Sequence, residues 1–60
     1  METSDIDRAI GAAVECEAAS DMAWRMLMAG DIEGAGRWLE RIEREEVVLR
    51  EALEALRAGR

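Results

Sequence analysis

Apolar residues recur along the chain at alternating steps of three and four, in two separate stretches. In the later stretch the series is Ile32, Ala35, Leu39, Ile42, Glu46, Leu49, Leu53 and Leu56, and seven of these eight positions are apolar. The earlier stretch repeats the spacing less purely, at Ile6, Ile10, Ala13, Glu17, Ser20, Trp24 and Leu27. Because this spacing places side chains on one side of an α-helix, each stretch is predicted to be a helix with an apolar seam.

Residues that favour helix ends delimit the two stretches. Ser4, with Asp7 three residues later, resembles a capping box in which aspartate replaces Glu or Gln. Gly30 suits the left-handed conformation that follows a helix, and Asp31 suits the cap of the next one. The predicted elements are a helix over about 4–29, a turn at Gly30-Asp31 and a helix over about 32–58.

Two features of these helices leave alternatives open. Ser20 and Asp21 could break the first helix, since serine and aspartate favour helix ends. Gly34 and Gly36 each cost a helix about 1 kcal/mol relative to alanine. They indicate either a close backbone approach beside a tryptophan or a frayed first turn.

Folded about the Gly30-Asp31 turn, the two seams would face each other. The predicted fold class is all-α, a single-domain antiparallel two-helix hairpin. A chain of 60 residues buries only about 60% of its unfolded surface, and one cysteine, Cys16, allows no intrachain disulfide. We therefore expect a homodimer that forms a four-helix bundle. The expected core-seam residues are Ile6, Ile10, Trp24, Leu27, Ile32, Leu39, Ile42, Leu49, Leu53 and Leu56.

Four apolar residues lie off the seams. Met22 and Met26 fall on the far side of the first helix, and Val47 and Val48 fall away from the seam of the second. Scattered apolar surface is ordinary in proteins. The alternative is a second buried face, made by self-association or by a partner, for which methionine is well suited.

Part of the chain resembles a known helical repeat. Gly30-Asp31, followed by the small Ala35 and the large apolar Leu39, resembles the turn and second helix of a tetratricopeptide-type repeat. A solenoid needs about three repeats and no second copy is present, so the resemblance implies a hairpin. The overall plan is similar to plasmid copy-control hairpins, which dimerise into four-helix bundles and bind RNA through basic and polar residues. No matching basic face exists in this chain.

The composition removes most catalytic chemistry. The chain has no histidine and no lysine, and no phosphate-binding loop, catalytic pair or zinc motif. Cys16, without a basic neighbour, is expected to be a small buried hydrophobe. Glu17 and Glu46 on the seams could hold a divalent cation, but more often form a polar layer or pair with an arginine such as Arg41 or Arg50. We expect no enzyme, no cofactor and no metal.

Negative charge is concentrated in the first third of the chain. The net charge is −6, and residues 1–21 hold Glu2, Asp5, Asp7, Glu15, Glu17 and Asp21 against Arg8 alone, a balance of −5. Such a chain should repel nucleic acid and anionic membranes and attract a basic protein surface. The expected partner-binding acidic face is Asp7, Glu17 and Asp21.

The predicted function is that of a small acidic regulator or adaptor that binds protein through helical packing. The alternative is an acidic inhibitor of the phage type, similar in size and charge to some anti-CRISPR proteins, which would imitate nucleic acid and block a basic site. No apolar run approaches the roughly 20 residues of a membrane span, and the start of the chain lacks a basic signal-peptide region. With its lone cysteine, the chain is expected to be cytoplasmic.

Overall fold

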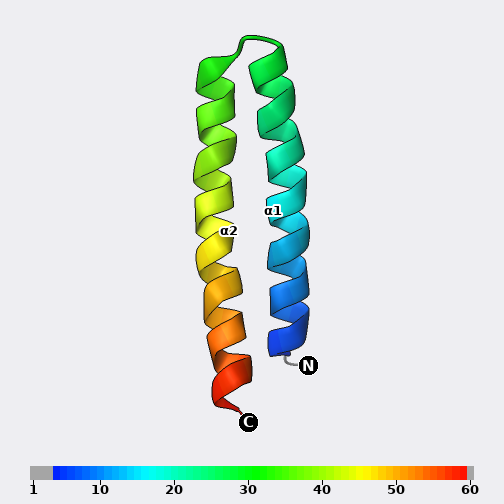
Figure 1. The fold of residues 1–60 in the computed structure, drawn as a ribbon, viewed down its shortest axis with the longest axis vertical. Coiled ribbons are helices and arrows are strands. Elements are labelled where there is room, and N and C mark those ends of the chain that lie inside the picture. Colours follow the sequence, from blue (N-terminus) through cyan, green and yellow to red (C-terminus); the bar gives the residue numbers. More distant parts are fainter. Residues whose placement is uncertain (1–3, 60) are drawn as a thin grey trace.

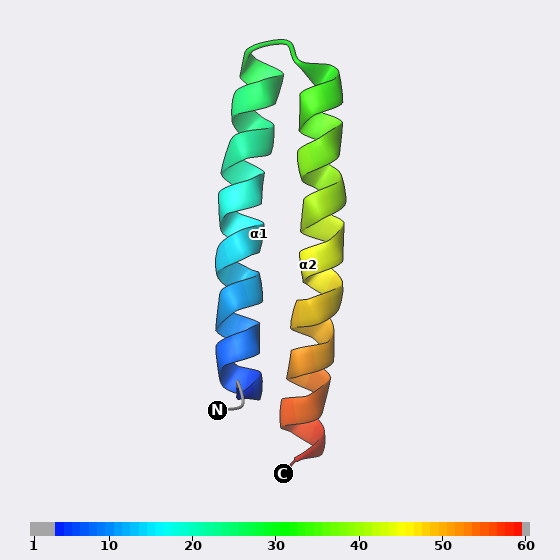
Figure 2. The same cartoon turned by 180° about the vertical axis from the view of Figure 1, so that it is seen from behind.

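Two antiparallel helices joined by a tight turn make up the fold (Figure 1). The computed structural model describes residues 4–59, with α1 at Asp5–Met28 and α2 at Ile32–Ala58. Both views show the helices side by side, with the end of α2 projecting beyond the start of α1 (Figures 1 and 2). The molecule is 46 Å long but only 18 × 15 Å across, so it is a single layer of two helices.

The predicted hairpin and its helix bounds are confirmed. α1 begins and ends within one residue of the predicted 4–29, and it continues without a break through Ser20 and Asp21. Its apolar contacts with α2 outweigh the small preference of those two residues for helix ends. Within residues 4–59, no helix combines the length and apolarity needed to cross a membrane.

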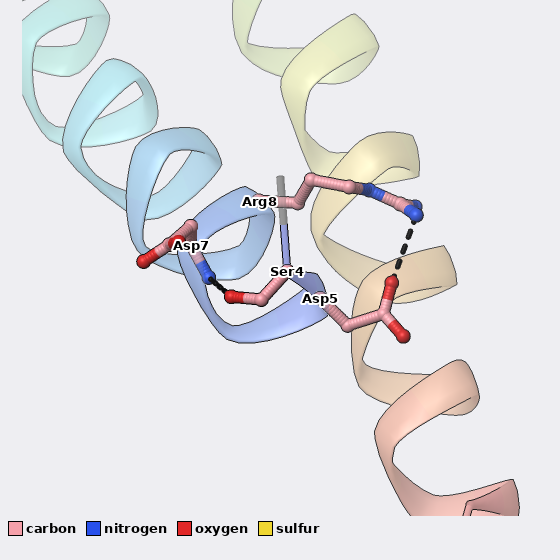
Figure 3. Close-up of polar contacts among 4 residues, drawn as sticks. All are labelled: Ser4, Asp5, Asp7 and Arg8. Carbon is pink, nitrogen blue, oxygen red and sulfur yellow. Dashed lines mark hydrogen bonds and ion pairs between the residues drawn. The ribbon is translucent and has the colours of Figure 1, made fainter. Parts of the chain in front are cut away.

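The first turn of α1 is held by short-range polar contacts (Figure 3). Ser4 is the N-cap, and its hydroxyl oxygen accepts a hydrogen bond of 3.1 Å from the backbone N–H of Asp7. Arg8 forms an ion pair of 2.9 Å with Asp5 on the same turn. Asp5 and Asp7 also lie at the positive end of the helix dipole, which favours negative side chains. These contacts explain why the helix starts where the sequence predicts.

Gly30 and Asp31 make the turn as predicted. Gly30 has a φ of 79°, a conformation in which glycine has no steric penalty. The Asp31 carboxylate caps α2 by accepting a 2.8 Å hydrogen bond from the backbone N–H of Gly34. A Cβ at Gly34 would collide with that carboxylate, so the cap accounts for this glycine. Gly36 differs, because nothing lies within 4 Å of the position its Cβ would take.

Small side chains form the contact between the helices. The four buried apolar residues are all alanines: Ala12, Ala19, Ala35 and Ala52, with exposed fractions of 3%, 1%, 8% and 0%. Buried and half-buried positions recur at steps of three and four on both helices, which marks the sides that face each other. On α1 the series is Asp5, Ala9, Ala12, Cys16, Ala19, Ala23 and Met26, with Glu15 and Met22 half-buried beside it. On α2 it is Ala35, Trp38, Ile42, Glu45, Leu49, Ala52 and Leu56, with Gly34 buried beside it.

The predicted core seam is therefore wrong for α1 and half right for α2. On α1 the facing series lies one residue before the predicted one, a rotation of about 100°. On α2 the predicted Ile42, Leu49 and Leu56 do face α1 and are half-buried. Alanine at the contact lets the two helix backbones approach closely, and the larger residues are left outside it. Seven predicted seam residues are exposed, namely Ile6, Ile10, Trp24, Leu27, Ile32, Leu39 and Leu53.

Candidate interaction surface

An ion pair between the helices identifies which flanks of α1 and α2 lie on the same side of the layer. Arg41 Nη2 and Glu15 Oε2 are 2.9 Å apart. On α2, Arg41 and Leu39 lie on opposite flanks of the series that faces α1, and the same holds for Glu15 and Ala13 on α1. Since Glu15 and Arg41 share one side of the hairpin, the flanks of Ala13 and Leu39 share the other.

That other side carries the large apolar residues. Ile6 and Leu27 lie on the same flank as Ala13, at helical spacings of seven, and Ile32 and Leu53 lie with Leu39 in the same way. Ile10 and Trp24 border this flank on α1, each three or four residues from its members. We call this set the apolar face: Ile6, Ile10, Trp24, Leu27, Ile32, Leu39 and Leu53.

The members of the apolar face are strongly exposed. Their exposed fractions are 57% for Ile6, 57% for Ile10, 60% for Trp24, 56% for Leu27, 69% for Ile32, 53% for Leu39 and 38% for Leu53. Single exposed apolar residues are ordinary on a protein surface. Seven of them on one side of two helices, interrupted by Ser20 and Glu46, form a larger group, and groups of this kind mark interaction sites.

A hollow of about 450 Å³ lies on the same side, toward the open end of the hairpin. Leu49 and Leu53 supply its apolar lining, and Glu46, Arg50, Glu54 and Arg57 supply the charged remainder. The hollow is thus shallow and mixed in character, with two leucines among four charged side chains.

The total exposed area gives a second measure of the uncovered surface. The chain exposes 4747 Å², whereas a compact monomer of its mass of 6.7 kDa is expected to expose about 3,900 Å². The excess of about 800 Å² is what an elongated layer of two helices, 46 × 18 × 15 Å, exposes beyond a compact domain.

The side opposite the apolar face is more polar. It holds the Glu15–Arg41 ion pair and a shallow hollow of about 270 Å³ lined by Arg37, Trp38, Arg41 and Arg44. Val48 shares the Arg41 flank and is 38% exposed, and its neighbour Val47 is 48% exposed. Both valines are thus accessible, as the sequence predicts.

The methionines differ from the prediction. Met22 and Met26 are half-buried and do not lie on the far side of α1. The reason is the rotation of α1, which turns Met26 into the contact with α2 and Met22 to its edge. They stabilise the hairpin and are not a separate apolar patch.

The three residues of the predicted acidic face are all exposed, and Asp7 and Asp21, fourteen residues apart, lie on one stripe of α1 with Glu17 beside it. Asp21 is paired with Arg25 at 2.9 Å, which neutralises one of the three charges locally. Asp7 lies near the start of α1, where its negative charge favours the helix. Glu17 lies between Ile10 and Trp24 at the border of the apolar face. The structure therefore gives the acidic residues three different surroundings.

Cys16 lies between the helices, as expected, and is half-buried. Its thiol lies 4.0 Å from the backbone carbonyl oxygen of Ile42. Burial raises the pKa of the Cys16 thiol, and the negative charges of Glu46, Glu45 and Glu15 raise it further. A raised pKa keeps the thiol protonated at neutral pH, and a protonated thiol is a poor nucleophile.

The seam carboxylates also lie elsewhere than predicted. Glu17 and Glu46 are exposed, whereas the half-buried carboxylates are those of Asp5, Glu15 and Glu45. Arg41 pairs with Glu15, not with either of the two predicted glutamates. Among residues 4–59, no three His, Cys, Asp or Glu side chains are grouped so that they could hold a metal ion.

Comparison with protein-family models, curated proteins and solved structures found no match for this chain.

Proposed function

We propose that this chain is a small non-enzymatic protein-binding module, a regulator or adaptor, which acts through helical packing and dimerises into a four-helix bundle. The observation that carries this proposal is the apolar face, seven large side chains on one side of two helices. Covering them with a second layer of helices would convert an exposed surface into a core.

The internal contact favours this arrangement. The hairpin buries no side chain larger than alanine completely among the described residues, so its own core is small for a stable domain. Two hairpins stacked on their apolar faces would add a core between the layers. A homodimer with two-fold symmetry uses the same surface patch on both copies, and one apolar face per chain is what that symmetry requires.

A further protein partner would meet the outside of the bundle. The net charge of −6 per chain then lies mainly on the surfaces left free, so the partner should be basic where it binds. The alternative is an acidic inhibitor in which Asp7, Glu17 and Asp21 imitate the phosphates of nucleic acid. Competition with nucleic acid for the partner's site would favour the alternative, because weakening by salt is expected of either mode of binding.

Sedimentation equilibrium over a range of concentrations tests the proposal. The wild type should approach twice the chain mass of 6.7 kDa as concentration rises. Leu39→Glu places a charge in the middle of the apolar face and should abolish the dimer. Val48→Glu is the matched control, because it places the same charge on the opposite side and should leave the dimer intact. A mass of one chain at every concentration, or equal effects of the two variants, would contradict the proposal.

A further inference from the structure

Gly36 is an exposed glycine inside a helix with no reason for it within the hairpin. A Cβ there would meet nothing within 4 Å, and the φ of Gly36 is not in the left-handed region. On the surface of α2, Gly36 lies between Ile32, four residues earlier, and Leu39, three residues later. Because Gly36 has no side chain, it leaves a gap between these two side chains at the border of the apolar face.

The largest exposed side chain of the apolar face lies level with this gap. The contact between Cys16 and Ile42 fixes the relative height of the two antiparallel helices. Eight residues nearer the turn on each helix, Trp24 on α1 is level with Gly34 on α2. This is within two residues, roughly 3 Å, of Gly36. Within one hairpin the two residues lie at opposite outer edges of the apolar face, too far apart to touch.

A two-fold axis parallel to the helices brings them together. We infer that the second copy packs face to face with its turn at the same end, so that Trp24 of each copy fills the gap at Gly36 of the other. This inference rests on the proposed dimer. Rotation about such an axis exchanges the edges of the face and keeps the height, so α1 of one copy lies on α2 of the other. A large side chain over a glycine is a knob in a hole.

The other residues of the face agree with this arrangement. By the same count, Ile6 is within one residue of the level of Leu53 of the second copy, and Leu27 is within one residue of the level of Ile32. Apolar residues then meet apolar residues at both ends of the face. Asp7 is level with Arg50 of the second copy, which gives opposite charges at the border. The open-end hollow, lined in part by Leu53 and Arg50, would receive Ile6 and Ile10.

The opposite orientation, with the turns at opposite ends, fits less well. It packs α1 of one copy antiparallel on α1 of the other. Apolar residues then meet apolar residues when the two Glu17 residues lie opposite each other. Trp24 then meets Ile10, a large residue on a large one, and the two Glu17 carboxylates meet each other. Gly36 is left without a large partner. Packing and charge therefore both favour turns at the same end.

The first experiment fills the gap at Gly36 with a larger side chain and measures dimerisation by sedimentation equilibrium. Gly36→Leu should raise the dimer dissociation constant at least about tenfold, because the leucine occupies the place of Trp24. The matched control is Gly11→Leu, since a Cβ at Gly11 also meets nothing within 4 Å but Gly11 lies on α1 away from the apolar face. It should leave dimerisation unchanged. Trp24→Ala combined with Gly36→Leu should restore most of the affinity, because the large and small residues are exchanged.

The second experiment measures the orientation directly. Spin labels on Ala29→Cys, in a Cys16→Ala background, mark the turn of each copy. Turns at the same end predict a label separation of roughly 10–25 Å, given helix spacings of 8–10 Å and flexible labels. Turns at opposite ends, in the register centred on Glu17, predict a separation of roughly 36 Å along the axis, because Ala29 lies twelve residues from Glu17.

The outcomes separate this inference from the proposed function. A chain that stays monomeric in sedimentation overturns both. A dimer whose labels lie roughly 36 Å or more apart, or whose affinity is unchanged by Gly36→Leu, overturns the inference and leaves the dimer standing. Short label distances together with the exchange rescue support it. Circular dichroism of each variant at low concentration verifies that the hairpin itself still folds.

Discussion

The contact between the two helices and the apolar face beside it use opposite kinds of residue. Ala12, Ala19 and Ala52 are almost completely buried, while Trp24 and Ile32 are among the most exposed large apolar residues. A large side chain contributes more free energy on burial than alanine does. The hairpin thus buries the side chains that gain the least free energy on burial and leaves exposed those that would gain the most. We therefore expect the alanine contact to stabilise the hairpin and the apolar face to serve association with another chain.

Overfilling the helix contact should give the largest loss of stability. Ala19→Leu inserts a bulky side chain where only 1% of the residue is exposed, and should destabilise the hairpin by about 1–3 kcal/mol. Ala18→Leu is the matched control one residue away, on an exposed position, with an expected change within about 0.5 kcal/mol. Urea unfolding at one protein concentration compares them. Similar losses for both would mean that the alanine series is not the helix contact.

Truncating a leucine on each of the two surfaces should affect folding in one case and dimerisation in the other. Leu49 faces α1 and is half-buried, so Leu49→Ala should cost about 1–3 kcal/mol of folding stability, below the range for fully buried leucines. Leu53 belongs to the apolar face, and Leu53→Ala should mainly weaken dimerisation. Thermal unfolding at several concentrations distinguishes these effects, because only association makes the midpoint depend on concentration. A strong loss for Leu53→Ala at high dilution would contradict the assignment of Leu53.

A charge within the apolar face should have a smaller effect. Glu46 is exposed in the hairpin and lies between Leu39 and Leu53, so dimerisation would remove its carboxylate from water. Glu46→Leu should strengthen dimerisation several-fold, since replacing a buried charge by an apolar residue is often stabilising. The stability of the hairpin at high dilution should change by less than about 0.5 kcal/mol. Weaker dimerisation would indicate that Glu46 makes specific bonds across the interface.

The ends and turns of the helices could be predicted from the sequence because they depend on local chemistry. Ser4 and Asp31 cap helices through their own side chains, and Gly30 adopts a conformation that few other residues tolerate. Each of these effects acts within a few residues. Distant parts of the chain have little influence on them.

The face that each helix turns toward the other could not be predicted in the same way. Two series with identical spacing run along α1, one through Ala12 and Ala19 and one through Ile10 and Trp24. Ranking by apolarity selects the second, because it contains the larger residues. The first series makes the contact within the chain, and the second stays exposed. A pattern of apolar residues shows which sides of a helix favour burial, but it does not show whether the same chain or another one covers them.

The emission of Trp24 tests most directly whether the apolar face is covered by association. In a Trp38→Phe variant Trp24 is the only tryptophan, and its side chain is 60% exposed in the hairpin. As concentration rises, its emission should shift to shorter wavelength and its quenching by iodide should fall, over the same range in which the sedimentation mass doubles. If the mass doubles while Trp24 remains as exposed as in dilute solution, the dimer uses another surface and the account is wrong.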